Sequence, residues 1–259
     1  MLILLPPSEG KADPAEGPPV DLATLAFDDH LRGGRSRLIG KLEKLAERPR
    51  AKAVEALGIS PGQAGDVDRD AEVLTAPAAP AAEVYSGVLY DHLGLNGLGS
   101  VAAKRAADHV LIASALWGVL RPTDRIPYYR LSMKARLPRL PGLAAYWREP
   151  LAAAMEDAGH DEEGGLILDM RSGAYSTAWK PKRARLLAVR AFTEKDGERK
   201  AVSHMAKATR GDVARLVLSA RKTPRDAESI ANLLESAGQR VELSGGHLDV
   251  IVGSDGRQA

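Results

Sequence analysis

The sequence LWGVLRPTDRIPYYRLSM occupies residues 116–133 and combines cationic, acidic and aromatic side chains in one short stretch. It contains three arginines, two tyrosines, one tryptophan and one aspartate, together with Pro122 and Pro127. Proline fixes its own φ and restricts the preceding residue, so Arg121 and Ile126 are pushed toward extended backbone. A rigid loop with cations and aromatic rings suits the binding of an anion or a stacked base. A salt-bridged surface loop is the alternative interpretation.

The segments on both sides of this loop predict strands that alternate with helices. Apolar runs and alternation predict strands at residues 2–5, 109–114, 165–170, 185–192, 201–204, 240–243 and 248–252. Helical spacing of apolar residues predicts helices at 37–47, 50–57, 83–93, 100–107, 141–157, 206–220 and 226–237. The stretches 12–36 and 58–82 are predicted to be a long loop and a connector. We therefore expect one compact domain over residues 1–259, with a mixed α/β (α+β) fold and a central mixed sheet flanked by helices.

Composition narrows the classes of protein and of chemistry. A hydrophobic content of 44% with 27% charged residues is typical of a soluble globular protein. Cysteine is absent, which excludes disulfides, thiolate catalysis and cysteine-held clusters. No apolar run approaches the length of a membrane span, and the short apolar start lacks the basic region of a signal peptide. We expect a cytoplasmic protein with no membrane partner.

Positive charge is concentrated in the last third of the chain. Between Lys180 and Arg225 there are fourteen Lys or Arg residues and only four acids. The stretch 200–238 forms the basic helical part of this region. Such an imbalance is typical of a protein with a polyanionic partner. A solvated basic face, balanced by acids elsewhere in the fold, is the alternative.

Ser8, Glu9 and Lys11 follow the first predicted strand and are candidates for a small-molecule site. A strand-end loop with Ser, Gly and Lys can surround phosphate oxygens with backbone N–H groups and an ammonium. The spacing is not that of a Walker A loop. Glu9 beside Lys11 could also act as a general acid or base at a pocket rim. A turn with solvated charges is the alternative.

The segment around Tyr85 predicts a helix face that borders a pocket. Residues 85, 88, 89 and 92 share one face at helical spacing, so Tyr85 and His92 could face the same pocket. A hydrogen-bonded packing role is the alternative for His92. The six histidines form no closely spaced pair, and we predict neither a metal site nor a cofactor.

Two later segments contain further polar candidates. Asp169 and Arg171 follow a predicted buried strand, where ligands of α/β sheets commonly bind. An internal ion pair of Asp169 with Arg171 or Arg121 is an equal alternative. In the predicted helix 206–220, Lys207, Arg210 and Arg215 line one side, and Gly211 lets a backbone or a phosphate approach closely. A solvated basic face is the alternative for this helix.

Four ordered motifs together resemble the YaaA family of peroxide stress proteins. They are MLILLPPSEGK at the start, YSGVLYDHLGL at 85–95, LILDMRSGAYSTAW at 166–179 and SHMAKATRGDVARLVL at 203–218, and the central loop at 116–133 resembles the central signature of the same family. The best-known members open with a Ser-Pro-Ala-Lys type of sequence, so PPSEGK marks a separate branch. The resemblance implies a single mixed α/β domain, DNA binding through a basic cleft, and a role in limiting free iron during peroxide stress. Lys207, Arg210 and Arg215 match the family pattern.

Two functions are consistent with these residues. The first is a DNA-binding protein of the YaaA type that grips phosphates and recognises distorted or single-stranded DNA, because no sequence-reading motif is present. The alternative is an enzyme that acts on a small nucleotide-like or phosphorylated substrate, because carboxylates accompany the cations. A scaffold that docks another protein on its basic face is a third, weaker possibility. The candidate catalytic residues are Glu9, Lys11, Tyr85 and Asp124. The candidate nucleic-acid or anion-binding residues are Ser8, Arg121, Tyr129, Arg130, Arg171, Lys207, Arg210 and Arg215.

Overall fold

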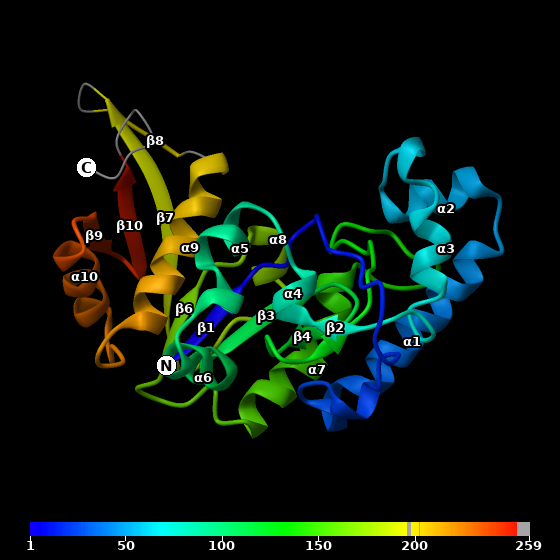
Figure 1. Cartoon of the computed structure of the whole chain (residues 1–259), viewed down its shortest axis with the longest axis horizontal. Helices are drawn as coiled ribbons and strands as arrows, with labels where there is room; N and C mark the ends of the chain where they lie inside the picture. The colour runs from blue at the N-terminus through cyan, green and yellow to red at the C-terminus, as the bar shows by residue number, and fades with distance from the viewer. Residues whose placement is uncertain (196–197, 202, 253–259) are drawn as a thin grey trace.

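Parallel strands form the centre of an eight-stranded sheet (Figure 1). The computed structural model describes residues 1–195, 198–201 and 203–252. The neighbouring parallel strands are, in order, β3 (Val110–Ser114), β1 (Leu2–Leu5), β6 (Leu166–Asp169), β7 (Arg185–Lys195) and β10 (His247–Val252). Antiparallel strands extend the sheet: β4 (Gly118–Leu120) beside β3, β9 (Arg240–Ser244) beside β10, and β8 (Glu198–Ala201) on β7.

The first strand shows why this sequence forms a parallel sheet. All four residues of β1 are buried, as expected for a strand covered on both faces. In the register, Leu4 lies opposite Leu111 of β3 and Asp169 of β6. The carboxyl ends of β1, β3 and β6 therefore meet at one edge of the sheet, which we call the carboxyl edge. Their first residues meet at the opposite, amino edge.

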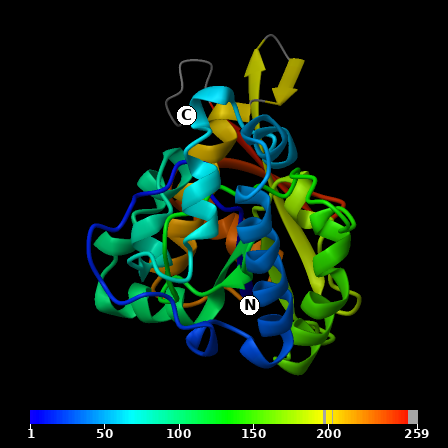
Figure 2. The same ribbon diagram turned by 90° about the vertical axis from the view of Figure 1, so that its right-hand side faces the viewer.

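The helices form two groups. In the first group, α9 (Ser203–Ser219) packs against β7, and α5 (Val88–Leu93), α6 (Ser100–His109) and α10 (Ala227–Ser236) pack against α9. The second group comprises α1 (Asp28–Ala46), α2 (Arg50–Leu57), α3 (Asp66–Ala71) and α7 (Leu143–Asp157). Shorter elements are α4 (Ala81–Val84), α8 (Gly173–Ser176), and the paired β2 (Ala79–Pro80) and β5 (Arg125–Ile126). Figure 2 shows α1 in blue beside α7 in green.

Two glycines allow close helix packing. A Cβ on Gly211 of α9 would lie 2.4 Å from the Leu89 carbonyl oxygen of α5. A Cβ on Gly34 of α1 would lie 2.7 Å from the Trp147 ring of α7. The close approach predicted at Gly211 is therefore to a neighbouring helix backbone, so this glycine is not open to a phosphate.

The structure confirms the mixed α/β fold with a central mixed sheet, and it corrects several predicted segments. The predicted loop 12–36 contains the first turns of α1, and the predicted connector 58–82 contains α3. The predicted helix 83–93 is two helices, α4 and α5, separated at Gly87, whose φ is +97°. Of the strand predicted at 201–204, Ala201 is the last residue of β8, whereas residues 203 and 204 belong to α9, so the prediction is wrong for these two residues. Val202 lies outside the described residues.

None of the helices in the described part of the chain combines the length and the apolar character needed to span a bilayer.

Candidate functional site

The loop after β1 is fixed against residues 84–90 at the carboxyl edge. Lys11 pairs with Tyr85 in an antiparallel β-bridge, and the Ala12 amide donates to the Val84 carbonyl at 2.8 Å. The Ser8 hydroxyl accepts a hydrogen bond from the Ser86 amide at 3.1 Å. These contacts join two of the sequence motifs, which are more than seventy residues apart. The candidates Ser8, Lys11 and Tyr85 are thus held in one region.

The Lys11 ammonium lies in a partly buried position between aromatic rings. Its Nζ donates to the Ser8 carbonyl at 2.8 Å and lies 4.5 Å from the centroid of the Tyr129 ring and 5.6 Å from that of Tyr85. Burial, followed by repulsion from the Arg130 cation, lowers the pKa of Lys11 from 10.5 to about 8. Lys11 therefore stays mostly protonated at pH 7 but loses its proton at a lower pH than an ordinary lysine. Such an amine can donate a proton or, when neutral, act as a base or nucleophile.

A chain of hydroxyl groups runs beneath Lys11. The Tyr85 and Tyr129 hydroxyls are 2.7 Å apart, and the Tyr129 hydroxyl lies 2.8 Å from the Ser114 hydroxyl at the end of β3. The Trp117 amide donates to the Ser114 oxygen at 3.0 Å. Burial raises the pKa of both tyrosines well above the ordinary value, so both phenols stay protonated. The chain fixes the two rings that flank Lys11.

Asp70 and Arg130 complete the cluster. Asp70 lies on α3, is almost fully buried, and accepts the Arg130 amide on Oδ1 at 2.6 Å. Its Oδ2 is buried without a hydrogen-bond partner. Burial raises the pKa of Asp70 from 3.8 to about 7. The Arg130 guanidinium donates to the Glu9 carbonyl at 3.0 Å, and the Glu9 carboxylate, 3.7 Å from Arg130, lies exposed at the rim.

We call Lys11, Asp70, Tyr85, Tyr129 and Arg130 the Lys11 centre. Lys11, which is partly buried, and Asp70, which is buried, both have pKa values shifted toward neutrality by desolvation. A buried carboxylate oxygen without a hydrogen-bond partner is a polar arrangement that a core would not need. The centre can hold an anion through its cations and exchange protons through Asp70 and Lys11.

The central loop is divided between this centre and the rest of the fold. Tyr129 and Arg130 belong to the Lys11 centre, whereas Arg121 and Asp124 do not. Strand β4 runs back antiparallel to β3, so Arg121 lies beside a separate cavity of about 310 Å³, near Leu2 and Val110 of the amino edge. The Asp124 carboxylate accepts the amides of Ala26 and Arg121, both at 2.9 Å. Asp124 thus fastens the loop that precedes α1 instead of joining the predicted proton-transfer group.

Asp169 and Arg171 form a buried ion pair, one of the two alternatives predicted for Asp169. The guanidinium donates to both carboxylate oxygens at 2.9 Å and to the Trp179 carbonyl at 3.0 Å. The two side chains are only 3% and 5% exposed. Arg171 is therefore not placed to contact a ligand from solvent, in contrast to its predicted anion-binding role.

The three predicted cations of α9 have different surroundings. Lys207 is exposed. Arg210 is partly buried, and its Nε donates to the Val189 carbonyl at 3.3 Å. Arg215 donates to the Leu93 carbonyl at 2.9 Å and so caps the carboxyl end of α5. Of these three cations, Lys207 alone has no hydrogen bond to a backbone carbonyl among the contacts of the described residues.

Tyr85 and His92 do not share one helix face. Tyr85 caps α4 and points into the Lys11 centre, whereas the His92 Nδ1 lies 3.0 Å from the Asp212 carboxylate of α9. The predicted common pocket is wrong for this pair, because Gly87 interrupts the helix between them.

The basic segment is not a continuous stripe of unpaired cations. Arg183 pairs with Glu156, Arg190 with Asp249, and Arg199 with both Glu194 and Glu242. Lys195 also lies in this segment, but its side chain is not among those that the structure describes. Within the described residues, no group of three or more His, Asp or Glu side chains is placed to hold a metal ion.

Sequence reasoning missed Asp70 and Ser114. Asp70 lies in a polar stretch, DVDRDA, that we interpreted as a connector. Ser60 and Gln63 have the spacing of a capping box, which indicates a helix start a few residues before Asp70. The structure has this capping box at the start of the short helix Pro61–Gln63. Ser114 was predicted only as the end of a strand, and its partner Tyr129 is fifteen residues away.

The lowered pKa of Lys11 makes the free energy of unfolding depend on pH. Its pKa is lower in the folded chain (about 8) than the ordinary 10.5, so between these values the unfolded state binds the extra proton. Stability must then rise with pH over this window, by about 3 kcal/mol for a shift of this size. The free energy of unfolding of the wild type relative to Lys11→Met, from urea unfolding at pH 7.5 and pH 10.5, should increase by that amount. An unchanged difference would contradict the partly buried position of the ammonium.

Fold and site together define an α/β protein with a buried lysine centre at the carboxyl edge of its parallel strands. The chain belongs to the YaaA family: the family model described as peroxide stress protein YaaA matches residues 1–241. A UPF0246 protein of Streptomyces coelicolor is 44% identical, over 97% of this chain and 98% of the relative. UPF0246 proteins of Corynebacterium efficiens and Corynebacterium glutamicum are 37% and 35% identical, each over 97% of this chain and 98% of the relative. The resemblance deduced from the motifs is confirmed.

Proposed function

We propose that the protein binds DNA on the concave face above the Lys11 centre and protects it during peroxide stress. The observation that carries the proposal is the position of the partly buried Lys11 amine, between two tyrosyl rings and near the Arg130 cation. An amine and a guanidinium attract phosphate, and the two buried tyrosyl rings hold the amine in place. The proposed ligand is DNA with unpaired nucleotides.

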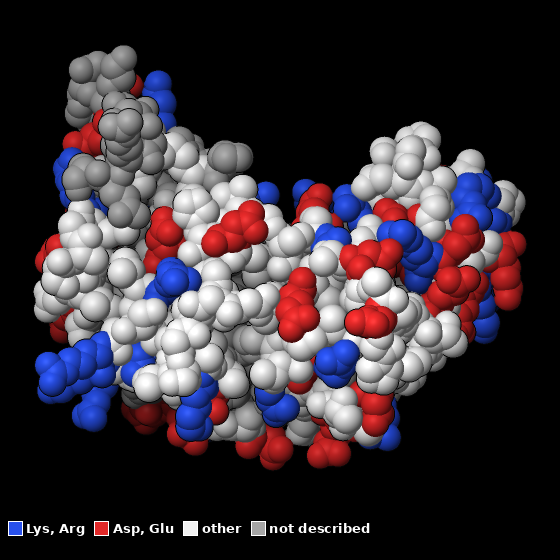
Figure 3. Space-filling model, viewed as in Figure 1, with Lys and Arg blue, Asp and Glu red and all other residues white. Residues whose placement is uncertain are grey.

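The shape of the molecule supports this proposal. Figure 3 shows a surface hollowed between two raised ends, and Figure 1 shows that these ends are built from β7, β8 and α9 on one side and from α2 and α3 on the other. The dark blue loop that follows β1 lies between them (Figure 1). A groove of this kind can track a nucleic-acid backbone while the floor receives one nucleotide.

The charges supply a limited number of phosphate contacts. Arg130 lies at the centre and Lys207 is exposed on α9, whereas Arg183, Arg190 and Arg199 are paired with acids. On duplex DNA, each phosphate contact adds about 0.9 to the steepness with which log K falls against log salt concentration. Because this protein makes few such contacts, we expect its affinity for DNA to depend only weakly on salt.

The double variant Arg130→Ala/Lys207→Ala tests the two cations. Because two phosphate contacts are removed, the salt slope for labelled DNA measured by fluorescence anisotropy should fall by about 2. The control Lys104→Ala/Arg183→Ala removes the same charge from exposed positions and should keep the wild-type slope. Thermal unfolding verifies that both variants fold. Equal slopes for the two variants would rule out these contacts.

An enzyme acting on a small nucleotide-like or phosphorylated substrate is the second candidate. The observation that favours it is the buried Asp70, whose Oδ2 has no partner and whose pKa lies at about 7. Asp70 would take a proton from the substrate and Lys11 would stabilise the resulting anion. Thermal shifts with nucleotides at millimolar concentration that disappear in Asp70→Asn would support this function, and no shift in the wild type would exclude it.

The proposal also includes that the protein limits the concentration of free iron in the cell during peroxide stress. The family description supplies the setting of peroxide stress for this chain. A deletion strain would be expected to contain more free iron under peroxide than its parent, and an equal level would separate DNA protection from iron control.

A further inference from the structure

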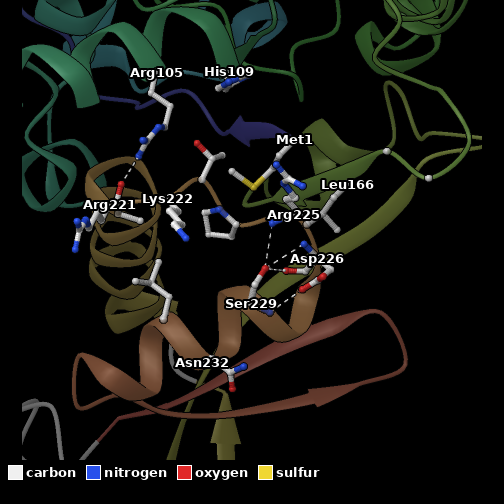
Figure 4. A pocket seen from close by; sticks show the side chains of 16 residues that line it. Met1, Arg105, His109, Leu166, Arg221, Lys222, Arg225, Asp226, Ser229 and Asn232 are labelled. Carbon is white, nitrogen blue, oxygen red and sulfur yellow. Dashed lines mark hydrogen bonds between the residues drawn. The ribbon is translucent and has the colours of Figure 1, made fainter.

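A second cavity lies at the amino edge of the sheet, away from the Lys11 centre. It has a volume of about 1460 Å³ and lies between α6, the connection from α9 to α10, α10 itself and the start of β6. Figure 4 shows side chains from these elements arranged around it, with Arg105 and His109 on one side and Ser229 and Asn232 on the other. A cavity of this size can accept a small organic ligand.

The charge of this cavity is strongly positive. Four cationic side chains line it: Arg105, Arg221, Lys222 and Arg225. The lining includes one acid, Asp226, and its carboxylate accepts the Ser229 amide at 2.7 Å as the N-cap of α10. Figure 3 also shows blue side chains gathered at the lower left, where Figure 1 places the α9–α10 connection.

The cations of the connection differ from the other cations of the basic segment. Among the described residues, no carboxylate lies within ion-pair distance of Arg221, Lys222 or Arg225, whereas Arg183 and Arg190 each have one. Three cations of one short connection without acidic partners repel one another and stabilise the fold less than paired ones. A bound anion would remove this repulsion.

Arg105 holds the geometry of the cavity. Its guanidinium donates to the Leu218 and Ala220 carbonyls at 2.6 and 2.7 Å, at the carboxyl end of α9. These bonds fix the point at which the cationic connection leaves the helix. Apolar side chains of Leu166, Pro224 and Leu233 supply another part of the lining.

We propose that this cavity binds a small anion with several phosphate groups, such as inorganic tripolyphosphate or a nucleoside triphosphate. Arg221, Lys222 and Arg225 contact the phosphates, because guanidinium and ammonium groups are the side chains that bind them in charge-assisted hydrogen bonds. The cavity is open to solvent, and its three cations without acidic partners lie in one short connection, which favours a small ligand over a DNA duplex. This site is independent of the Lys11 centre and of DNA binding on the concave face.

Isothermal titration calorimetry of the full chain with sodium tripolyphosphate and with ATP tests this proposal. We expect one molecule bound per chain at about physiological salt. In Lys222→Ala/Arg225→Ala the affinity should fall at least about tenfold, because two charge-assisted contacts are lost. Neither side chain has a described hydrogen bond or ion pair, so the variant should fold, which its unfolding temperature verifies.

A control variant and the comparison of ATP with tripolyphosphate show which results support the proposal and which overturn it. Arg37→Ala/Lys44→Ala removes the same charge from exposed positions on α1 and should keep the wild-type affinity. Tighter binding of ATP would identify a nucleotide that also contacts the apolar wall, and equal affinity would identify the phosphates alone as the recognised group; either result supports the proposal. Absence of binding at millimolar ligand, or equal losses in the two double variants, would overturn it.

Discussion

Replacing Lys11 by Met is expected to remove the preference of the protein for DNA with unpaired nucleotides. The Lys11 amine is the partly buried cation between the Tyr85 and Tyr129 rings, and Met keeps the length of the side chain without its charge. Loss of a charge-assisted contact to phosphate should weaken binding of a bubble DNA by about ten- to a hundredfold, with a smaller effect on intact duplex. Fluorescence anisotropy with both DNAs measures the two affinities.

The same variant should be at least as stable as the wild type at pH 7. The pKa of Lys11 is lowered to about 8 by burial, so at pH 7 the folded chain keeps a partly buried charge at a cost in free energy. Loss of binding without loss of stability separates a functional lysine from a structural one. Lys44→Met, at an exposed position on α1, is the matched control. Unchanged preference for the bubble in Lys11→Met would remove Lys11 from the site.

Replacing Asp169 by Ala is expected to produce the largest loss of stability. The change leaves the Arg171 guanidinium buried without its bidentate partner. Removing one member of a buried ion pair typically costs about 3–5 kcal/mol. Urea unfolding of the variant at pH 7 measures this cost.

The double variant Asp169→Ala/Arg171→Met separates charge from packing. Met fills part of the space of Arg171 without its charge, so a large part of the stability lost in Asp169→Ala should return. Equal stability of the single and double variants would show that the carboxylate itself, and not the unpaired cation, is what the fold requires.

The strands of the sheet could be predicted because their sequences are continuous apolar runs. LILL at residues 2–5 and the segment at 165–170 have this pattern, and both are central parallel strands. Helix α2 was predicted with its observed bounds, because Pro49 precedes it and Gly58 follows it in a left-handed conformation. In contrast, the first turns of α1 contain Gly33 and Gly34, which are typical of loops. Gly34 is required there by the Trp147 ring, which is more than one hundred residues away.

Part of the candidate site could be predicted, because several of its residues stand in distinctive sequence motifs. Lys11, Tyr85, Tyr129 and Arg130 stand in motifs that the sequence itself distinguishes, and the structure brings them together. Their convergence could not be derived from spacing, because it depends on strand order. Arg121 is separated from Arg130 by the reversal of β4, a tertiary feature with no local signal.

Fluorescence anisotropy of a labelled bubble DNA and a matched duplex, titrated with the wild-type protein, tests DNA binding on the concave face most directly. We predict binding at micromolar concentration or tighter that persists at about 0.15 M salt and favours the bubble. Binding that disappears by that salt concentration, or that is equal for the two DNAs, would contradict a site for unpaired nucleotides above the Lys11 centre.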